Sequence, residues 1–160
     1  MNLTEFFSSS DFQARLKLEL ERAQRYVRPL SLARITLDNL KALKKASRPS
    51  LKEAQSKLAT FFKENCRRSD VAGYYGNEEF ALILPETDAS GAFKVAERMR
   101  AKAASEKLLV GTEEIPLTLS AGVASYLLHA GSTKDLIKEA EEALEVARSS
   151  GDRVSGPPPE

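Results

Sequence analysis

Two adjacent carboxylates, Glu78 and Glu79, are the first residues whose types and spacing could support chemistry. They follow Gly76-Asn77 and precede an apolar run over 80–84. Because a Gly-Asn pair tolerates the positive φ angles of a two-residue turn, we expect the carboxylates at the tip of a β-hairpin. A carboxylate pair at such a tip is exposed and lies close to backbone that can approach a ligand. The alternative is a polar turn with solvated charges.

A guanidinium and a carboxylate form a second group, in Arg67-Arg68-Ser69-Asp70. The planar fork of an arginine can pair bidentately with phosphate or with guanine O6 and N7, and it can stack on a base. A carboxylate can accept hydrogen bonds from guanine N1–H and N2–H₂. An Arg-x-x-Asp pair without further context is equally consistent with a surface ion pair that contributes little.

The hydrophobic pattern predicts the elements that must position these groups. We expect helices over 11–26, 38–45, 49–66, 89–104 and 133–149, strands over 30–37 and 115–123, and the hairpin around 74–85. On the fourth of these helices, one apolar side is expected to hold Ala92, Phe93, Ala96 and Met99. This order predicts an α/β (α+β) fold with a mixed, largely antiparallel central sheet flanked by helices.

The composition fits one ordinary globular domain. The chain has 160 residues, 42% of them hydrophobic, and a formal net charge of +1, which gives no support for binding nucleic acid or an acidic membrane. The single cysteine, Cys66, and the lack of a signal peptide or an apolar span of ~20 residues predict a cytoplasmic protein. We expect one domain over 1–154 and a disordered Pro-rich tail over 155–160.

The run 75–80, Tyr-Gly-Asn-Glu-Glu-Phe, resembles the Gly-Gly-Asp/Glu-Glu-Phe signature of the GGDEF domain, the diguanylate cyclase family. Similar stretches follow the family order at 29–32, 117–123 and 140–148, so the resemblance extends from Leu3 to Val154. It implies a fold like the palm of nucleotide polymerases. It also implies Mg²⁺-dependent joining of two GTP molecules into cyclic di-GMP.

Several positions depart from the residues that this resemblance implies for the catalytic site. Glu78 keeps one metal-binding carboxylate, and Arg148 replaces a phosphate-binding lysine. The groups expected for metal, guanine and phosphate are replaced at Thr36, Lys44, Lys52, Asn77 and Asp152. Asp38, two residues after Thr36, is expected to point elsewhere. We therefore expect Glu78 and Glu79 to be catalytic remnants, with no bound metal, no required cofactor and no cyclase activity.

The second group matches an inhibitory cyclic di-GMP site of the same family. Five residues separate Asp70 from Gly76, as in that site, and Arg98 aligns with its second arginine. The resemblance implies an inactive receptor that binds cyclic di-GMP through Arg67, Asp70 and Arg98. It would signal through an unidentified protein partner or through a ligand-bridged homodimer. The alternatives are a nucleotide-independent interaction scaffold and a weakly active cyclase that binds GTP through Glu78 and Arg148.

Overall fold

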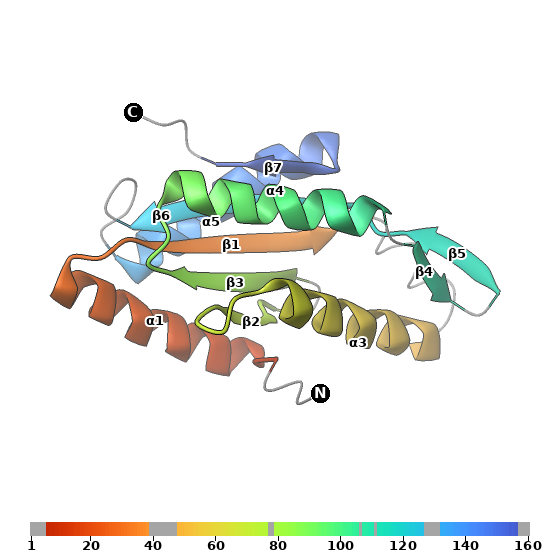
Figure 1. Cartoon of the computed structure of the whole chain (residues 1–160), viewed down its shortest axis with the longest axis horizontal. Coiled ribbons are helices and arrows are strands. Elements are labelled where there is room, and N and C mark those ends of the chain that lie inside the picture. The colour runs from red at the N-terminus through yellow and green to blue at the C-terminus, as the bar shows by residue number, and fades with distance from the viewer. Residues whose placement is uncertain are drawn as a thin grey trace.

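The computed structural model describes residues 6–38, 48–76, 79–105, 107–110, 112–126 and 132–156 (Figure 1). In chain order the elements are α1 (Ser9–Tyr26), β1 (Leu30–Leu37), α3 (Arg48–Asn65), β2 (Val71–Tyr74), β3 (Glu79–Pro85), α4 (Ala89–Ser105), β4 (Lys107–Val110), β5 (Glu113–Pro116), β6 (Leu119–Tyr126), α5 (Thr133–Ser150) and β7 (Arg153–Ser155). Within these ranges no helix has both the length and the apolar character needed to cross a membrane.

The main sheet has five strands in the order β2-β3-β1-β6-β7. All neighbours are antiparallel except β6 and β7, which are parallel. The predicted fold class, a mixed and largely antiparallel sheet flanked by helices, is confirmed. The central strand β1 pairs along its whole length with β6, and its register with β3 places Thr36 opposite Glu79.

Side chains of β1 alternate between two apolar layers, as expected for a strand buried on both faces. Ala33, Ile35 and Leu37 join the core under α3 and α4. Leu30 and Leu32 join the core under α1 and α5. Alternation therefore points residues 34 and 36 toward the α1 and α5 side of the sheet. A charged or hydroxyl side chain at either position must find a polar partner there.

The first helix begins and ends where local chemistry predicts. The Ser8 hydroxyl accepts a hydrogen bond from the Asp11 N–H and caps α1, and four inward residues at helical spacing are buried. These are Phe12, Leu16, Leu20 and Ala23. The helix ends at Val27, whose φ of 51° places a β-branched residue in the left-handed region just before Pro29. After this turn the chain reverses its direction and enters β1.

The last helix packs closely on β6 because Gly122 has no side chain. A Cβ at this position would lie 2.2 Å from the Leu144 backbone nitrogen and 2.3 Å from the Ala140 carbonyl oxygen. This contact holds α5 directly over β6, the neighbour of β1. It thereby places Glu141, on α5, above the middle of β1.

Two predictions about the elements are wrong, and one strand was not predicted. The strand expected over 115–123 is broken: β5 ends at Pro116 and pairs with β4 in a separate two-stranded ribbon, and β6 begins at Leu119. Proline lacks an N–H for ladder pairing, which favours a strand end there. Phe93, expected on the apolar side of its helix, is exposed. The short strand β7 was not predicted.

Other predicted features lie outside the described residues. They are the greater part of the short helix over 38–45, the Asn77-Glu78 turn, and residues 157–160 of the tail. Lys44 falls in the same category, and the side chain of Lys52 is not described.

Candidate functional site

The signature carboxylate Glu79 opens β3 and is bound by an arginine of the neighbouring strand. Arg34 donates from Nε to Glu79 Oε2 at 2.9 Å, and its Nη2 lies 2.7 Å from the same oxygen. The Arg34 side chain is only 6% exposed, and that of Glu79 is 20% exposed. Such a pair in a partly dry environment is held by charge-assisted hydrogen bonds, stronger than those of exposed surface pairs.

Two further groups surround the Arg34 guanidinium. Its carbon lies 4.1 Å from the centre of the Tyr75 ring, and Nη1 lies 3.6 Å from Glu141 Oε2 on α5. Burial raises the pKa of Tyr75, while the Arg34 charge lowers it and the Glu79 and Glu141 charges raise it. The cation is therefore enclosed by two carboxylates and a π face. Sequence reasoning missed Arg34, although a charge at an inward position of a central strand was a detectable signal.

The described residues at this edge do not suit a divalent cation. A magnesium ion takes oxygen ligands, usually with one or two carboxylates. Thr36, directly opposite Glu79, supplies only a neutral hydroxyl, and it is buried. Glu79 already accepts from a guanidinium, whose positive charge would repel a metal ion.

The third acidic residue near this edge, Asp38, is used structurally. Its Oδ1 accepts from the Ser120 hydroxyl at 2.6 Å, and its Oδ2 accepts from the Asp152 backbone N–H at 2.8 Å. These contacts turn Asp38 toward β6 and the chain after α5. The Asp152 carboxylate lies 2.8 Å from Arg100 Nη1, and Arg148 pairs with Glu145. The contacts of Asp38 and Asp152 tie the chain after α5 to β6, to α4 and to the end of β1, whereas the Arg148–Glu145 pair lies within α5.

The predicted Arg67 and Asp70 form one compact unit between α3 and β2. The Arg67 backbone N–H donates to Asp70 Oδ2 at 2.9 Å, and Arg67 Nη2 donates to Oδ1 at 3.3 Å. The Asp70 side chain is 2% exposed, whereas that of Arg67 is 55% exposed. Both carboxylate oxygens therefore serve Arg67, and it is the guanidinium that faces solvent.

Arg98 reaches the same segment from α4. Its Nη2 donates to the Asn65 carbonyl oxygen at 3.3 Å, and its side chain is exposed. Cys66 lies among these groups, and burial together with the Asp70 charge raises the pKa of its thiol to about 12, against lowering by Lys63, Arg98 and Arg67. The structure thus brings Arg67, Asp70 and Arg98 around residues 65–70.

Arg67 also binds the segment between β3 and α4. Its Nη2 donates to Thr87 Oγ1 at 2.6 Å and to the Pro85 carbonyl oxygen at 3.3 Å. The Thr87 carbonyl in turn accepts from the buried Ser31 hydroxyl at 2.7 Å. Between them, Glu86 adopts a φ of 52°. Arg67 therefore helps to fix the backbone of residues 85–87.

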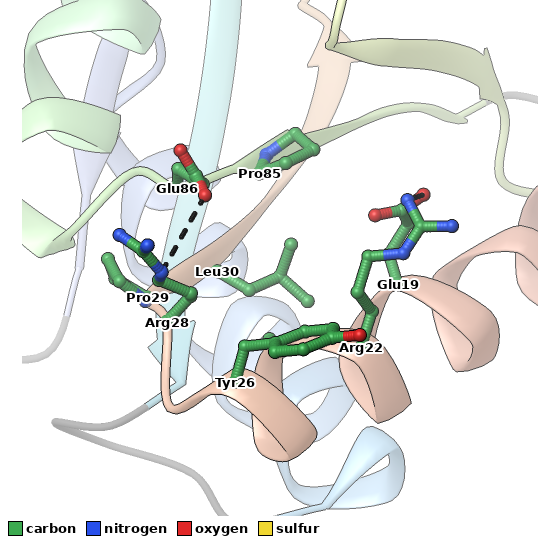
Figure 2. A pocket seen from close by; sticks show the side chains of 9 residues that line it. Glu19, Arg22, Tyr26, Arg28, Pro29, Leu30, Pro85 and Glu86 are labelled. Atoms are coloured by element: carbon green, nitrogen blue, oxygen red, sulfur yellow. Dashed lines mark hydrogen bonds and ion pairs between the residues drawn. The ribbon is translucent and has the colours of Figure 1, made fainter.

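The same segment forms one wall of a groove at the end of α1 (Figure 2). The groove has a volume of about 320 Å³ and is lined by Glu19, Arg22, Ala23, Tyr26, Arg28, Pro29, Leu30, Pro85 and Glu86. Arg28 Nε and Glu86 Oε1 lie 3.9 Å apart across it, as the dashed line in Figure 2 marks. Sequence reasoning missed this groove because its residues form no motif and meet only in the fold.

Comparisons with known proteins agree with this arrangement. The family model described as diguanylate cyclase, GGDEF domain, matches residues 2–153. The diguanylate cyclase DosC of Escherichia coli K12 is 31% identical over 151 residues, which are 93% of this chain and 33% of DosC. The chain thus spans about a third of the length of that relative.

Solved structures show the same fold. The GGDEF domain of DgcB from Caulobacter crescentus, in complex with c-di-GMP, superposes with a TM-score of 0.85 at 23% identity, covering 97% of this chain and 90% of that one. Diguanylate cyclase SiaD from Pseudomonas aeruginosa, in complex with its activator SiaC, superposes with a TM-score of 0.85 at 29% identity, covering 96% and 60%.

Proposed function

Because the chain belongs to the diguanylate cyclase GGDEF domain family, we propose that it is a member without cyclase activity that binds cyclic di-GMP through Arg67, Asp70 and Arg98. The observation that carries this proposal is the Arg67–Asp70 unit. A buried carboxylate holds an exposed guanidinium beside a second exposed arginine. The DgcB domain in complex with c-di-GMP supports a ligand of this class for this fold.

Each residue has a distinct role in the proposed binding. Arg67 and Arg98 supply planar donors for the phosphates and for the O6 and N7 acceptors of guanine. Asp70, whose oxygens both accept from Arg67, orients that guanidinium and can meet guanine N1–H and N2–H₂ only once Arg67 is displaced. Pre-orientation reduces the side-chain entropy lost on binding.

The proposed lack of cyclase activity depends on Thr36 and Glu79, which pair where β1 ends and β3 begins. Thr36 removes one carboxylate, and Arg34 neutralises Glu79. A site with a neutral hydroxyl and a resident cation would hold Mg²⁺ poorly, and Mg²⁺ supplies the charge neutralisation that phosphoryl transfer requires. The substitutions at Lys44, Lys52 and Asn77, predicted from sequence, add the loss of guanine recognition.

Signalling to a partner has a structural route in this account. When the ligand binds Arg67, the hydrogen bonds from Arg67 to Pro85 and Thr87 break or become bifurcated. Pro85 and Glu86 line the groove at the end of α1. Ligand binding would therefore change the wall of that groove. The solved SiaD complex shows that a protein with this fold is crystallised with an activator protein.

Calorimetric titration with cyclic di-GMP tests the binding proposal. Arg67→Ala should weaken binding by at least about tenfold, since a good bidentate pair is worth roughly 1–3 kcal/mol. Arg68→Ala is the matched control, because Arg68 is exposed and adjacent but outside the predicted set. Equal affinities of wild type and Arg67→Ala would refute the site. Formation of cyclic di-GMP from GTP and Mg²⁺ would refute the lack of activity.

A second candidate, a nucleotide-independent interaction scaffold, is favoured by one observation. Arg67 Nη2 already donates to acceptors on Asp70, Pro85 and Thr87, so this nitrogen acts as a structural clamp. The same titration separates the two candidates. The scaffold predicts no saturable heat with cyclic di-GMP in wild type.

A further inference from the structure

Arg34 is a buried cation in the middle of the central strand, and the binding function proposed for Arg67 leaves it unexplained. Its side chain is 6% exposed. A guanidinium at this depth is costly unless it is paired, and here Glu79, Glu141 and the Tyr75 ring all face it. These partners come from β3, α5 and the turn after β2, so the cation joins three elements on the α1 and α5 side of the sheet.

We propose that Arg34 is a built-in cation that takes the place of a divalent metal ion at the Thr36–Glu79 edge. Restoring the missing carboxylate at position 36 would then not be enough to restore metal binding. This inference rests on the proposed lack of cyclase activity and deepens it, because it names a second residue that must change.

The strand register places Arg34 on the same face of the sheet as Thr36 and Glu79. Thr36 and Glu79 are direct antiparallel partners, so their side chains lie on the same face, and Arg34 is two residues earlier on that face. An aspartate at position 36 would lie on the same face of the sheet as Glu79 and Arg34. Its charge would be met by Arg34, and a metal ion would have to displace that cation from both carboxylates.

The geometry favours arginine over lysine for this role. Nε and Nη2 contact Glu79 while Nη1 faces Glu141, which uses the fork of the guanidinium on two carboxylates at once. Its plane also lies against the Tyr75 ring. A lysine would keep the positive charge but would lose the fork and much of the ring contact.

Titration of the full chain with Mn²⁺ tests the proposal, with Thr36→Asp and the double variant Thr36→Asp/Arg34→Gln as the decisive pair. Glutamine keeps an amide donor for Glu79 and removes the charge. The double variant should bind Mn²⁺ at least about tenfold more tightly than Thr36→Asp, because even with the screening of bulk water a neighbouring unit cation repels a divalent ion by about that much. Thr36→Asp/Arg34→Lys should resemble Thr36→Asp.

Two results would overturn the proposal: Thr36→Asp binding Mn²⁺ as tightly as the double variant, or a folded double variant that shows no gain. Arg34→Met, an uncharged residue of similar length, provides a second background. If an uncharged variant is unfolded without metal, refolding on addition of Mn²⁺ supports the proposal and failure to refold contradicts it.

The metal-binding test does not depend on the proposed binding of cyclic di-GMP. Arg34 and Arg67 lie at different sites, so cyclic di-GMP affinity should be unchanged in Thr36→Asp/Arg34→Gln. Loss of the Mn²⁺ difference with intact cyclic di-GMP binding would remove this inference alone. Product formation by wild type from GTP would instead remove the proposed lack of activity.

Discussion

Replacing Asp70 should separate the structural role of this carboxylate from the ligand-facing role of Arg67. The Asp70 side chain is 2% exposed and accepts two hydrogen bonds, one from a backbone N–H and one from a guanidinium. Hydrogen bonds to a charged group contribute about 1.5–3 kcal/mol each, but the exposed guanidinium is screened, and its share is about 0–1 kcal/mol. Asp70→Ala also leaves the Arg67 N–H without its acceptor, so we expect a loss of about 2–3 kcal/mol in unfolding free energy.

The assay is urea unfolding followed by circular dichroism, with Arg67→Ala as the matched partner. Arg67→Ala should cost about 1 kcal/mol or less, because the Arg67 side chain is 55% exposed and the charge of an exposed partner is screened by solvent. Both variants should lose cyclic di-GMP affinity, although for different reasons. If Arg67→Ala destabilises the fold more than Asp70→Ala, or if Asp70→Ala is as stable as wild type, the assignment of Asp70 as the buried anchor is wrong.

Three further predictions concern the fold, the thiol and the groove. Gly122→Ala should lower the unfolding free energy by about 3 kcal/mol or more, read as a fall in Tm, because its Cβ would lie 2.2 Å from α5 backbone; an unchanged Tm would mean that β6 and α5 are not in this contact. Burial raises the pKa of the Cys66 thiol from 9.0 to about 12, so at pH 8 it should react with a thiol reagent roughly a thousandfold more slowly than in the unfolded chain. The contribution of the protonated thiol to the free energy of unfolding should be complete below pH 9 and lost as the pH rises toward 12. Rapid reaction of the folded protein would contradict the burial of this thiol. Tyr26→Trp introduces a single tryptophan into a chain that has none, and its emission should change on addition of cyclic di-GMP but not when Arg67→Ala is also present; a constant emission in Tyr26→Trp alone would separate the groove from the ligand site.

Sequence patterns were sufficient for the elements with strong periodicity. The inward residues Phe12, Leu16 and Leu20, the Ser8 cap and Pro29 define α1 and its ends, and the alternating run over 30–37 matches β1. The spacing of Arg67, Asp70 and Arg98 was enough to expect that they meet, and the structure places all three around residues 65–70. These predictions needed only hydrophobic periodicity, helix-end residues and the spacing between Asp70 and Gly76.

The remaining features depend on tertiary contacts that no local pattern contains. β5 ends at Pro116, but the apolar sequence continues into β6. Hydrophobic periodicity therefore predicted one strand where the structure has two strands in different sheets. Phe93 faces solvent because the small residues of α4, such as Ala92 and Ala96, make the contact with the sheet. The partners of Arg34 are 41 to 107 residues away along the chain, at Tyr75, Glu79 and Glu141, and only the register of β1 with β3 and the docking of α5 bring them together.

Calorimetric titration of the wild-type chain with cyclic di-GMP, run beside Arg67→Ala and Arg68→Ala, tests the central claim most directly. The account predicts saturable binding in wild type and Arg68→Ala and a loss of at least about tenfold in Arg67→Ala. Absence of binding in wild type, or equal affinity in all three proteins, would contradict it.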